Sequence, residues 1–291
     1  MIATQLELPL PETTSRWCQR WAGQRQTWQY ADPSERFDAT RYEVHPIDDT
    51  TAAGYVRANH YLGSYPAASR RYGLFRAGQL AGVAVYSIPV QASVLTLALP
   101  DLEPYTESLE LGRLVLGDSE PGNSETWFLA RCHEQLLDAG VRGVVSFADP
   151  LPRSRADGVE IKPGHVGIVY QAANARYTGR ATPRSLALLP DGSTFSDRAK
   201  QKIRRQERGH EYAEQQLIAW GARPMRAGEK PAIWLAAALE EAGARRVRHL
   251  GNHRYVFALG RTRRDRDRIR IGFDRAAYPK RPDRRALELA A

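Results

Sequence analysis

The sequence predicts an α/β (α+β) fold, in which a mixed central sheet is flanked by helices and followed by a basic C-terminal extension. Two observations predict this class. Between residues 41 and 180, apolar runs typical of strands alternate with amphipathic segments typical of helices. The 291 residues are 42% hydrophobic and 26% charged, the ordinary composition of a globular chain that is long enough to bury a sizeable core.

The elements of the central part follow one another in the order β-α-β-β-β-α-β-α. Asp48 and Asp49 suit the start of the first helix, Ala77-Gly78 suits the turn of a hairpin, and Gly140 suits the end of a helix. This order is that of the GCN5-related acyltransferase (GNAT) architecture. The predicted strands are 41–47, the hairpin 71–89, 108–117 and 141–147, and the predicted helices are 48–59, 124–140 and one that begins near His165.

The regions on either side of this part differ from it in composition. Near the N-terminus, Trp17, Trp21 and Trp28 are spaced so that they would share one face of a helix. After residue 200, the sequence predicts two helices and a strand, at 209–223, 230–244 and 254–260. The chain is therefore divided into an N-terminal extension, a GNAT-like core and a basic C-terminal region, at 1–40, 41–200 and 201–291.

The net charge is +9, with an isoelectric point of about 9.7, and its basic residues are concentrated toward the C-terminus. Residues 245–291 contain fifteen basic and five acidic residues, and a second basic cluster lies at 198–208. Concentrated arginine is typical of a surface that binds a phosphate backbone. The alternative interpretation is a solvated tail that serves solubility.

Cysteine usage and hydropathy exclude several classes of protein. The chain has two cysteines, Cys18 and Cys132, and no CxxC motif, which excludes a disulfide framework and a cysteine-rich zinc module. No apolar run reaches the ~20 residues that a membrane-spanning helix needs, and the N-terminus lacks the features of a signal peptide. We therefore expect a cytoplasmic protein without a membrane partner.

The start of the 124–140 helix is a candidate cofactor site. Gly122, Asn123, Ser124 and Glu125 lie where the exposed amides of a helix favour an anion such as a pyrophosphate. Glu125 opposes an anion, and the usual acetyl-CoA pattern, Arg/Gln-x-x-Gly-x-Gly/Ala, is absent. An ordinary capped helix is therefore the alternative interpretation.

Two further residues suit chemistry by their positions. Asp149 ends a buried strand and precedes Pro150, where it suits a general base, a metal ligand or the first residue of a turn. His60 follows a helix, where it suits a general base, a ligand or a charge at the helix dipole. Spacing alone does not choose among these roles.

Four strings of the chain carry a resemblance when they are taken together. They are NHYLGSYP (59–66), LELGRLVL (109–116), GNSETWFLARC (122–132), and SFADP followed by GHVGIVYQAANARYTG (146–179). The last contains Ser-aromatic-Ala-Asp-Pro, then Gly-His-x-Gly-x-x-Tyr-x-Ala, then an aromatic residue, Thr and Gly. In these strings the chain resembles the Mom family of phage DNA-modification proteins.

The resemblance implies a GNAT-like transferase that modifies adenine in double-stranded DNA. The family adds a carbamoylmethyl group to the exocyclic N6, which hides phage DNA from restriction enzymes. The implied donor is acetyl-CoA or another two-carbon donor, and family members have also been linked to iron. The matching positions imply functional roles for His60, Tyr61, Ser124, Asp149 and Tyr170, of which His60, Asp149 and Tyr170 offer ligands that a ferrous ion accepts.

A DNA substrate implies further expectations. A paired adenine would be flipped into a pocket, where Asp149 would accept a proton from N6, and the surrounding duplex would be held by phosphate contacts. The residues expected to contact DNA are Arg153, Arg198, Lys200, Lys202, Arg204, Arg205, Arg263, Arg264, Arg266, Arg268 and Arg270.

The chain departs from the family pattern in one place that concerns the site. Residues 151–163 separate Asp149-Pro150 from Gly164-His165, and the family is expected to have a shorter gap. The extra residues include Arg153 and are expected to reshape the pocket. Two alternative functions stay open: a GNAT N-acetyltransferase that acts on a protein or small molecule, and a non-enzymatic DNA-binding protein.

Overall fold

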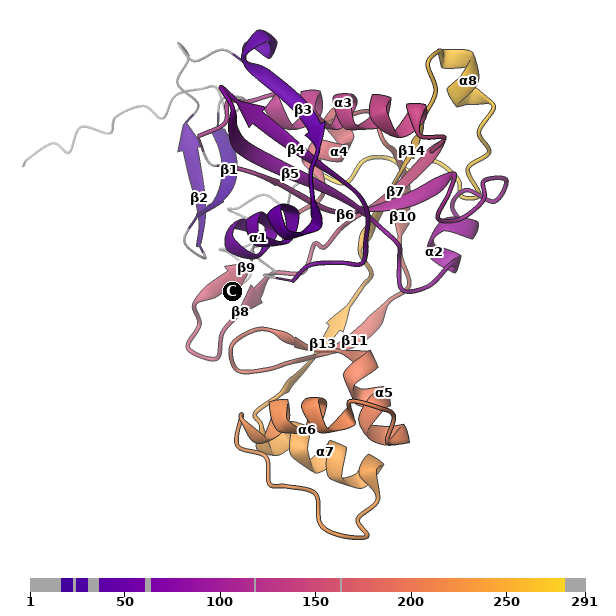
Figure 1. Cartoon of the computed structure of the whole chain (residues 1–291). Coiled ribbons are helices and arrows are strands. Elements are labelled where there is room, and N and C mark those ends of the chain that lie inside the picture. The colour runs from indigo at the N-terminus through magenta and orange to yellow at the C-terminus, as the bar shows by residue number, and fades with distance from the viewer. Residues whose placement is uncertain are drawn as a thin grey trace, which may run out of the picture.

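The computed structural model describes residues 17–22, 25–30, 37–60, 64–117, 119–162 and 164–280 (Figure 1). The predicted fold class is confirmed, because a seven-stranded mixed sheet carries helices on both faces. Within the described ranges, no helix has both the length and the apolar character that crossing a bilayer requires.

The strands of the main sheet lie in the order β10-β14-β7-β6-β5-β4-β3. All neighbouring pairs are antiparallel except the central pair, β6 and β7, which is parallel. The strands are β3 (Tyr42–Pro46), β4 (Ala68–Arg76), β5 (Gln79–Ser87), β6 (Ser108–Leu116), β7 (Gly143–Ala148), β10 (Arg176–Arg180) and β14 (His253–Ala258).

Helices cover both faces of this sheet. On one face, α1 packs against Val83, Val85 and Val115. On the other, Phe128 of α3 and Tyr170 of α4 belong to the largest apolar core. The helices of this part are α1 (Asp49–Asn59), α2 (Ser93–Thr96), α3 (Ser124–Asp138) and α4 (Ile168–Ala172).

Local signals in the sequence account for the first elements. The carboxylate of Asp48 accepts a hydrogen bond from the amide of Thr51 (2.9 Å) and so caps α1. The β4–β5 hairpin turns at Ala77 and Gly78, which both have positive φ (48° and 77°), as a tight two-residue hairpin turn requires. The predicted element order β3-α1-β4-β5-β6-α3-β7-α4 is confirmed.

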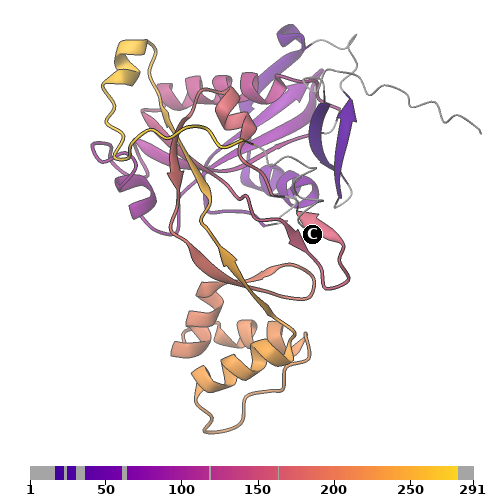
Figure 2. The same cartoon turned by 180° about the vertical axis from the view of Figure 1, so that it is seen from behind.

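A smaller unit, residues 184–249, is inserted between β10 and β14 and extends away from the main sheet (Figures 1 and 2). We call it the subdomain. Its three-stranded sheet, in the order β12-β11-β13, packs against three helices around a core that includes Phe195 and Trp234. Its elements are β11 (Arg184–Leu188), β12 (Thr194–Phe195), α5 (Asp197–Arg205), α6 (His210–Ile218), α7 (Pro231–Glu241) and β13 (Arg245–His249).

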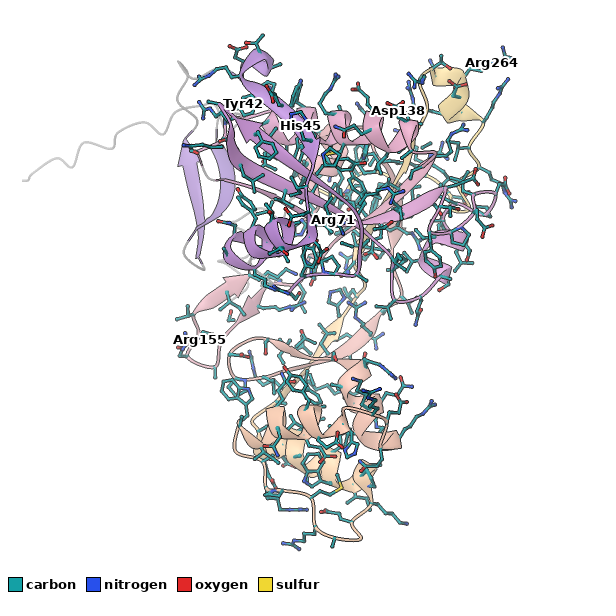
Figure 3. The ribbon with its side chains drawn as sticks, in the orientation of Figure 1. Tyr42, His45, Arg71, Asp138, Arg155 and Arg264 are labelled. Carbon is teal, nitrogen blue, oxygen red and sulfur yellow. The ribbon has the colours of Figure 1, made fainter. Side chains whose placement is uncertain are left out.

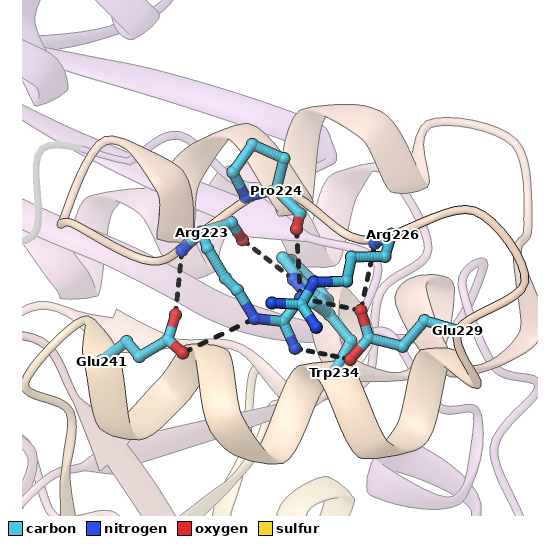
Figure 4. A network of polar contacts seen from close by, with 6 residues as sticks. All are labelled: Arg223, Pro224, Arg226, Glu229, Trp234 and Glu241. Carbon is cyan, nitrogen blue, oxygen red and sulfur yellow. Dashed lines mark hydrogen bonds and ion pairs between the residues drawn. The ribbon is translucent and has the colours of Figure 1, made fainter.

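A polar network around Arg223 fixes the loop between α6 and α7 (Figure 4). The guanidinium of Arg223 donates two hydrogen bonds to Glu229 (2.6 and 2.7 Å), and its amide donates to Glu241 (2.9 Å). The indole of Trp234 donates to the carbonyl of Arg223 (2.9 Å). These contacts use two of the acidic side chains of the subdomain within its own fold.

The structure corrects two expectations about organisation. β14 lies beyond residue 200 but occupies the main sheet between β10 and β7, so the core is not confined to 41–200. Instead of the expected N-terminal helix, β1 (Trp17–Ala22) and β2 (Arg25–Tyr30) form an antiparallel hairpin. The spacing of four between two of the tryptophans is even, and therefore fits a strand as well as a helix.

The connection between β13 and β14 depends on Gly251. Its φ is +96°, and a Cβ at this position would lie 1.8 Å from the carbonyl oxygen of Ala181. We expect Gly251→Ala to lower the free energy of unfolding by about 2–3 kcal/mol, because the added methyl meets a backbone atom. Gly54→Ala is the control: Gly54 is exposed in α1 with nothing within 4 Å, so this change is expected to stabilise the protein by about 0.5–1 kcal/mol. Urea unfolding of both variants measures the difference, and equal stabilities would contradict the packing described.

Candidate functional site

The pairing between the two central strands of the main sheet stops halfway. β6 and β7 pair from Ser108 opposite Gly143 to Leu111 opposite Ser146, although both strands continue beyond these residues. At this point β6 also contains a bulge at Gly112. A bulge bends a strand and re-aims the side chain that follows it. The two strands therefore part at the centre of the sheet, where ligand sites of parallel strands commonly lie.

Three side chains surround the point of parting. Tyr170 of α4 is within hydrogen-bonding reach of Ser146, and its pKa is raised by burial. From the other face of the sheet, the charges of two residues of β6 also shift the pKa of Tyr170: Arg113 lowers it and Glu110 raises it. Burial raises the pKa of Glu110, against the opposing effect of the Arg113 guanidinium. Two ionisable groups and a tyrosine hydroxyl thus lie within electrostatic reach of one another where the backbone pairing ends.

His60, which follows α1, lies within electrostatic reach of Arg113 in this site. Its amide donates to the carbonyl of Val56 (2.9 Å) and closes the helix. Burial lowers the pKa of His60 to about 3, and the positive charges of Arg113, His165 and Lys162 lower it further. The imidazole is therefore neutral at neutral pH.

The loop after α1 contacts the site through Arg113. The guanidinium of Arg113 donates to the carbonyl (3.1 Å) and the hydroxyl (2.8 Å) of Ser64. It also donates to the carbonyl of Gly112 (2.6 Å), in the bulge. Arg113 therefore ties the NHYLGSYP string to the parting strands. Tyr61 of that string lies outside the described residues.

Asp149 lies at the end of β7 and is held by four donors. Its carboxylate accepts hydrogen bonds from Arg153 (2.8 Å), His249 (2.9 Å) and the amide of Leu151 (3.0 Å), and it forms an ion pair with Lys162. Burial alone would raise the pKa of Asp149, but Lys162, His249 and Leu151 together lower it well below its usual range. A carboxylate held in this way is a poor proton acceptor, so the geometry favours a positioning role over the expected role as a base.

The tautomer of His249 follows from its two hydrogen bonds. Its Nδ1 accepts from the amide of Gly251 (2.9 Å), so the proton of the neutral ring is on Nε2, which donates to Asp149. The ring is fully buried, and it belongs to β13 of the subdomain. Asp149 therefore joins the main sheet to the subdomain across 100 positions of sequence.

The segment between Asp149-Pro150 and Gly164-His165, which was expected to be longer than in the family, contains a hairpin that returns to the site. β8 (Arg153–Ser154) and β9 (Glu160–Lys162) pair, and the amide of His165 then donates to the carbonyl of Asp149 (2.9 Å). The hairpin supplies Arg153 and Lys162 to Asp149. The side chain of Arg153 is 12% exposed, so the expectation that it contacts DNA is replaced by a role inside the site.

The predicted residues His60, Asp149 and Tyr170 are linked through shared cations. The charge of Lys162 lowers the pKa of both His60 and Asp149. The charge of Arg113 lowers the pKa of His60 and opposes the rise in the pKa of Tyr170. Sequence reasoning missed the residues Glu110, Arg113, Lys162 and His249. The first two lie inside the LELGRLVL string, which signals them once it is aligned with β6, whereas only the fold brings His249 to Asp149.

The expected cofactor residues lie at the start of α3. Asn123 has φ +76° and makes no side-chain capping bond, and Gly122 is exposed. Ser124 is buried, and its hydroxyl donates to the carbonyl of Pro121 (2.6 Å), so it shapes the turn. Glu125 is in the first turn of the helix. The first amides of α3 thus lack a side-chain cap, which suits an anion, while Glu125 opposes one.

The residues expected to hold iron do not fit a metal site. Among the described residues, no group of three or more His, Cys, Asp and Glu side chains is close enough to hold a metal ion. Both carboxylate oxygens of Asp149 are already bound to cations or to a histidine.

The other residues expected to contact DNA lie at two ends of the molecule. One group belongs to α5 of the subdomain: Arg198, Lys200, Lys202, Arg204 and Arg205. The other lies in and after α8 (Arg263–Asp267), which follows β14: Arg263, Arg264, Arg266, Arg268 and Arg270. Figure 3 shows Arg264 near Asp138 at one end and Arg155, in the β8–β9 hairpin, toward the other.

Comparison with models of known protein families identifies the family of this chain. The model of the Mom protein family matches residues 41–280, which include the main sheet, the site and the subdomain. The chain belongs to the Mom protein family. The match extends beyond the strings at 59–179 and therefore includes the subdomain of this Mom protein as well as its core.

Solved structures offer weaker similarities. The Mom chain is similar to YhbS from Escherichia coli, a GNAT family N-acetyltransferase in complex with CoA, with 14% identity, 40% of this chain and 67% of that chain covered, and a TM-score of 0.29. It is also similar to yncA from Salmonella typhimurium, whose structure contains acetyl-CoA, with 8% identity, 77% and 96% covered, and a TM-score of 0.36. No curated protein matches the chain. Similarities at this level assign neither substrate nor activity.

Proposed function

We propose that this Mom-family chain is a GNAT-like transferase that modifies the exocyclic N6 of adenine in double-stranded DNA by carbamoylmethylation, and so protects phage DNA from restriction. The family match over residues 41–280 carries the proposal. The element order and the ionisable groups at the parting of β6 and β7 support a transferase.

An amine that attacks a donor must lose a proton, and Glu110 is the residue suited to accept it. Its raised pKa makes the carboxylate a stronger base than an exposed glutamate, and Arg113 keeps the charged form accessible. Asp149 has a lowered pKa and occupied oxygens, so it accepts protons poorly. We therefore assign the role of proton acceptor to Glu110 in place of Asp149.

His60 and Tyr170 suit positioning and charge stabilisation. Because the pKa of His60 is about 3, its ring is neutral and places no positive charge beside the amine. The raised pKa of Tyr170 keeps its hydroxyl protonated, so it donates a hydrogen bond to negative charge that develops on the donor. Both side chains are buried enough for these interactions to be strong.

The donor proposed is a two-carbon group carried on coenzyme A, whose thiol leaves as the bond to N6 forms. An acetyl group contains no nitrogen, so the carbamoylmethyl product requires a transferred group that already carries its nitrogen, as a glycyl group does; glycyl and carbamoylmethyl groups are isomers. The amides of the first turn of α3 have no side-chain cap and suit the pyrophosphate of coenzyme A. A paired adenine cannot reach the parted strands while it is stacked in the duplex. We therefore propose that the target adenine is flipped out of the duplex before it is modified.

Nucleoside mass spectrometry tests the proposal. DNA from cells that express the chain is expected to contain a modified deoxyadenosine with the added mass of a carbamoylmethyl group, and DNA from cells that express Glu110→Gln is expected to lack it. An acetylated protein or small molecule with unmodified DNA would indicate an N-acetyltransferase instead. Binding to DNA without any modification would indicate a non-enzymatic DNA-binding protein.

A further inference from the structure

We propose that cations on α5 and β13 of the subdomain, and not the arginines around α8, hold the sugar–phosphate backbone of the duplex beside the candidate site. This inference rests on the proposed function, because it takes duplex DNA as the substrate. We call the surface formed by Lys200, Lys202, Arg204, Arg246 and Arg248 the subdomain basic face.

The subdomain leaves the main sheet at the same end as the candidate site. Asp149 directly follows β7, and His249, which binds Asp149, ends β13. Ala148 of β7 pairs with His253, the first residue of β14. A duplex held along β13 would therefore run toward the residues that surround the parting of β6 and β7.

The arginines around α8 lie at the opposite end of β7. β14 ends where Ala258 pairs with Gly143, the first residue of β7, and α8 begins five residues later. This point lies roughly 17 Å from the Asp149 end along the strand. Arg261 is paired with Asp138 (2.5 Å) at the far end of α3, and Arg270 with Asp101 (3.4 Å). The arginines around α8 therefore lie beyond the end of β7 that is opposite to Asp149.

Several cations of the subdomain basic face have no acidic partner. Among the described residues, no carboxylate lies within 4 Å of Lys202, Arg204, Arg246 or Arg248. Three of these four side chains are exposed, and Lys202 is partly exposed. Cations that the fold leaves without an acidic partner are available to replace the counterions of a phosphate backbone.

Several acidic residues of the subdomain are engaged away from this face. Glu229 and Glu241 bind Arg223 in the network of Figure 4, and Glu214 binds His210 (2.8 Å). Glu207 binds Arg198 (2.6 Å), whereas Asp197 pairs with Lys200 of the subdomain basic face (2.8 Å). The other cations of that face keep their positive charge uncompensated.

A pocket at this face suits one unit of a DNA backbone. It has a volume of about 420 Å³, and its lining includes the apolar residues Leu186, Leu239 and Ala244 and the cations Lys200, Arg204 and Arg246. Apolar side chains suit a deoxyribose, and cations beside them suit its phosphates. The pocket lies in the subdomain, apart from the parted strands, so it suits a docking contact and not the reaction site.

Register places the β13 cations in line with this pocket. Arg246 pairs with Ala187 and Arg248 with Ser185, so these two arginines occupy one face of the β11–β13 pair. Arg246 also donates to the hydroxyl of Ser185 (3.4 Å). A row of cations therefore leads from α5 along β13 toward His249.

Charge reversal in two matched places tests the inference. The first variant changes Arg204, Arg246 and Arg248 to Glu, and the control changes Arg263, Arg264 and Arg268 to Glu, an equal change in charge. All six side chains are exposed, so both variants are expected to keep the thermal stability of the parent. Fluorescence anisotropy with a short DNA duplex at several salt concentrations measures binding independently of chemistry.

The first variant is expected to bind on the order of 100-fold more weakly, with a log–log salt slope shallower by about 3, because about three phosphate contacts are lost. The control is expected to bind like the parent. A control that loses as much affinity as the first variant would overturn the inference, and so would a first variant that binds like the parent.

Two further outcomes separate this inference from the proposed function. If the parent binds duplex DNA through the subdomain basic face but yields no modified adenosine, the proposed function fails and the docking surface stands. If the parent modifies DNA and the first variant modifies it equally well, the docking surface fails and the proposed function stands. A parent that binds single-stranded RNA more tightly than duplex DNA would overturn the docking proposal in favour of RNA.

Discussion

Glu110→Gln is expected to lower the rate of DNA modification by on the order of 100-fold or more, because the amide cannot accept the proton that the adenine amine must lose. Glutamine has nearly the same volume and keeps the side chain polar, so the fold is expected to persist. The rate is measured with a supplied donor and duplex DNA, and circular dichroism confirms folding.

A pH profile gives the same hypothesis a second readout. Only the ionised form of Glu110 accepts a proton, and its pKa lies above that of an ordinary glutamate because the side chain is buried. The rate is therefore expected to fall as the pH drops through this raised pKa, at a higher pH than an exposed carboxylate would give. The residual rate of Glu110→Gln is expected to lack this dependence.

Glu134→Gln is the matched control. Glu134 is 55% exposed on α3, where its ion pair with Arg131 stays within the helix. Its replacement is expected to leave both the rate and the pH profile unchanged. If Glu110→Gln modifies DNA as fast as the parent, another group accepts the proton.

Much of the main sheet was predictable because its signals are local. The β4–β5 hairpin has a tight turn with Gly at its second position, and α1 has an aspartate cap, so each element is encoded within a few residues. The placement of β14 was not predictable in this way. Its strand signal was clear, but its partners β7 and β10 are more than 70 residues away, and no local pattern specifies such pairing.

Strand β13 shows a second limit of what sequence patterns can predict. β13 is Arg-Arg-Val-Arg-His, which has one apolar residue and no clear alternation, and its strand conformation depends on pairing with β11. Its high charge was attributed to a C-terminal tail. In the fold, β13 is separated from the arginines around α8 by the whole length of β14.

The candidate site was predicted in part. His60, Asp149 and Tyr170 were chosen through the family strings, and the structure links them through Arg113 and Lys162. The role of Asp149 was not predictable, because a carboxylate at a strand end has the same sequence signature whether it is free or bound. Its partners come from the β8–β9 hairpin and from β13 of the subdomain.

Asp149→Ala is expected to lower the free energy of unfolding at neutral pH by about 3–5 kcal/mol, because removing one member of a buried ion cluster leaves the other charges without compensation. Lys162 is 4% exposed and Arg153 is 12% exposed, so water does not replace the lost carboxylate. Asp157→Ala is the control from the same hairpin: its ion pair with Arg155 is half exposed, and its loss is expected to cost less than about 1 kcal/mol.

The pH dependence of this loss follows from two pKa shifts. The pKa of Asp149 is lowered in the folded state, so its stabilising contribution is complete above the unfolded pKa of about 3.9 and is lost as the pH falls through the folded value. Burial lowers the pKa of Lys162 to about 8, against the charge of Asp149, which raises it. Without Asp149, Lys162 releases its proton at a lower pH, which relieves part of the penalty.

The difference in stability between the parent and Asp149→Ala is therefore expected to be widest above about pH 4, to narrow as the pH falls below that value, and to narrow again as the pH rises toward about 8. Urea unfolding across this range measures this difference, and a constant difference at every pH would contradict the pKa shifts on which the prediction depends.

His249→Ala tests the hydrogen bond between Asp149 and the subdomain separately from the ion cluster. It leaves Lys162 and Arg153 on Asp149 and removes only the bond to β13, so it is expected to reduce modification more than duplex binding. A His249→Ala variant that modifies DNA at the parental rate would show that Asp149 does not position the subdomain.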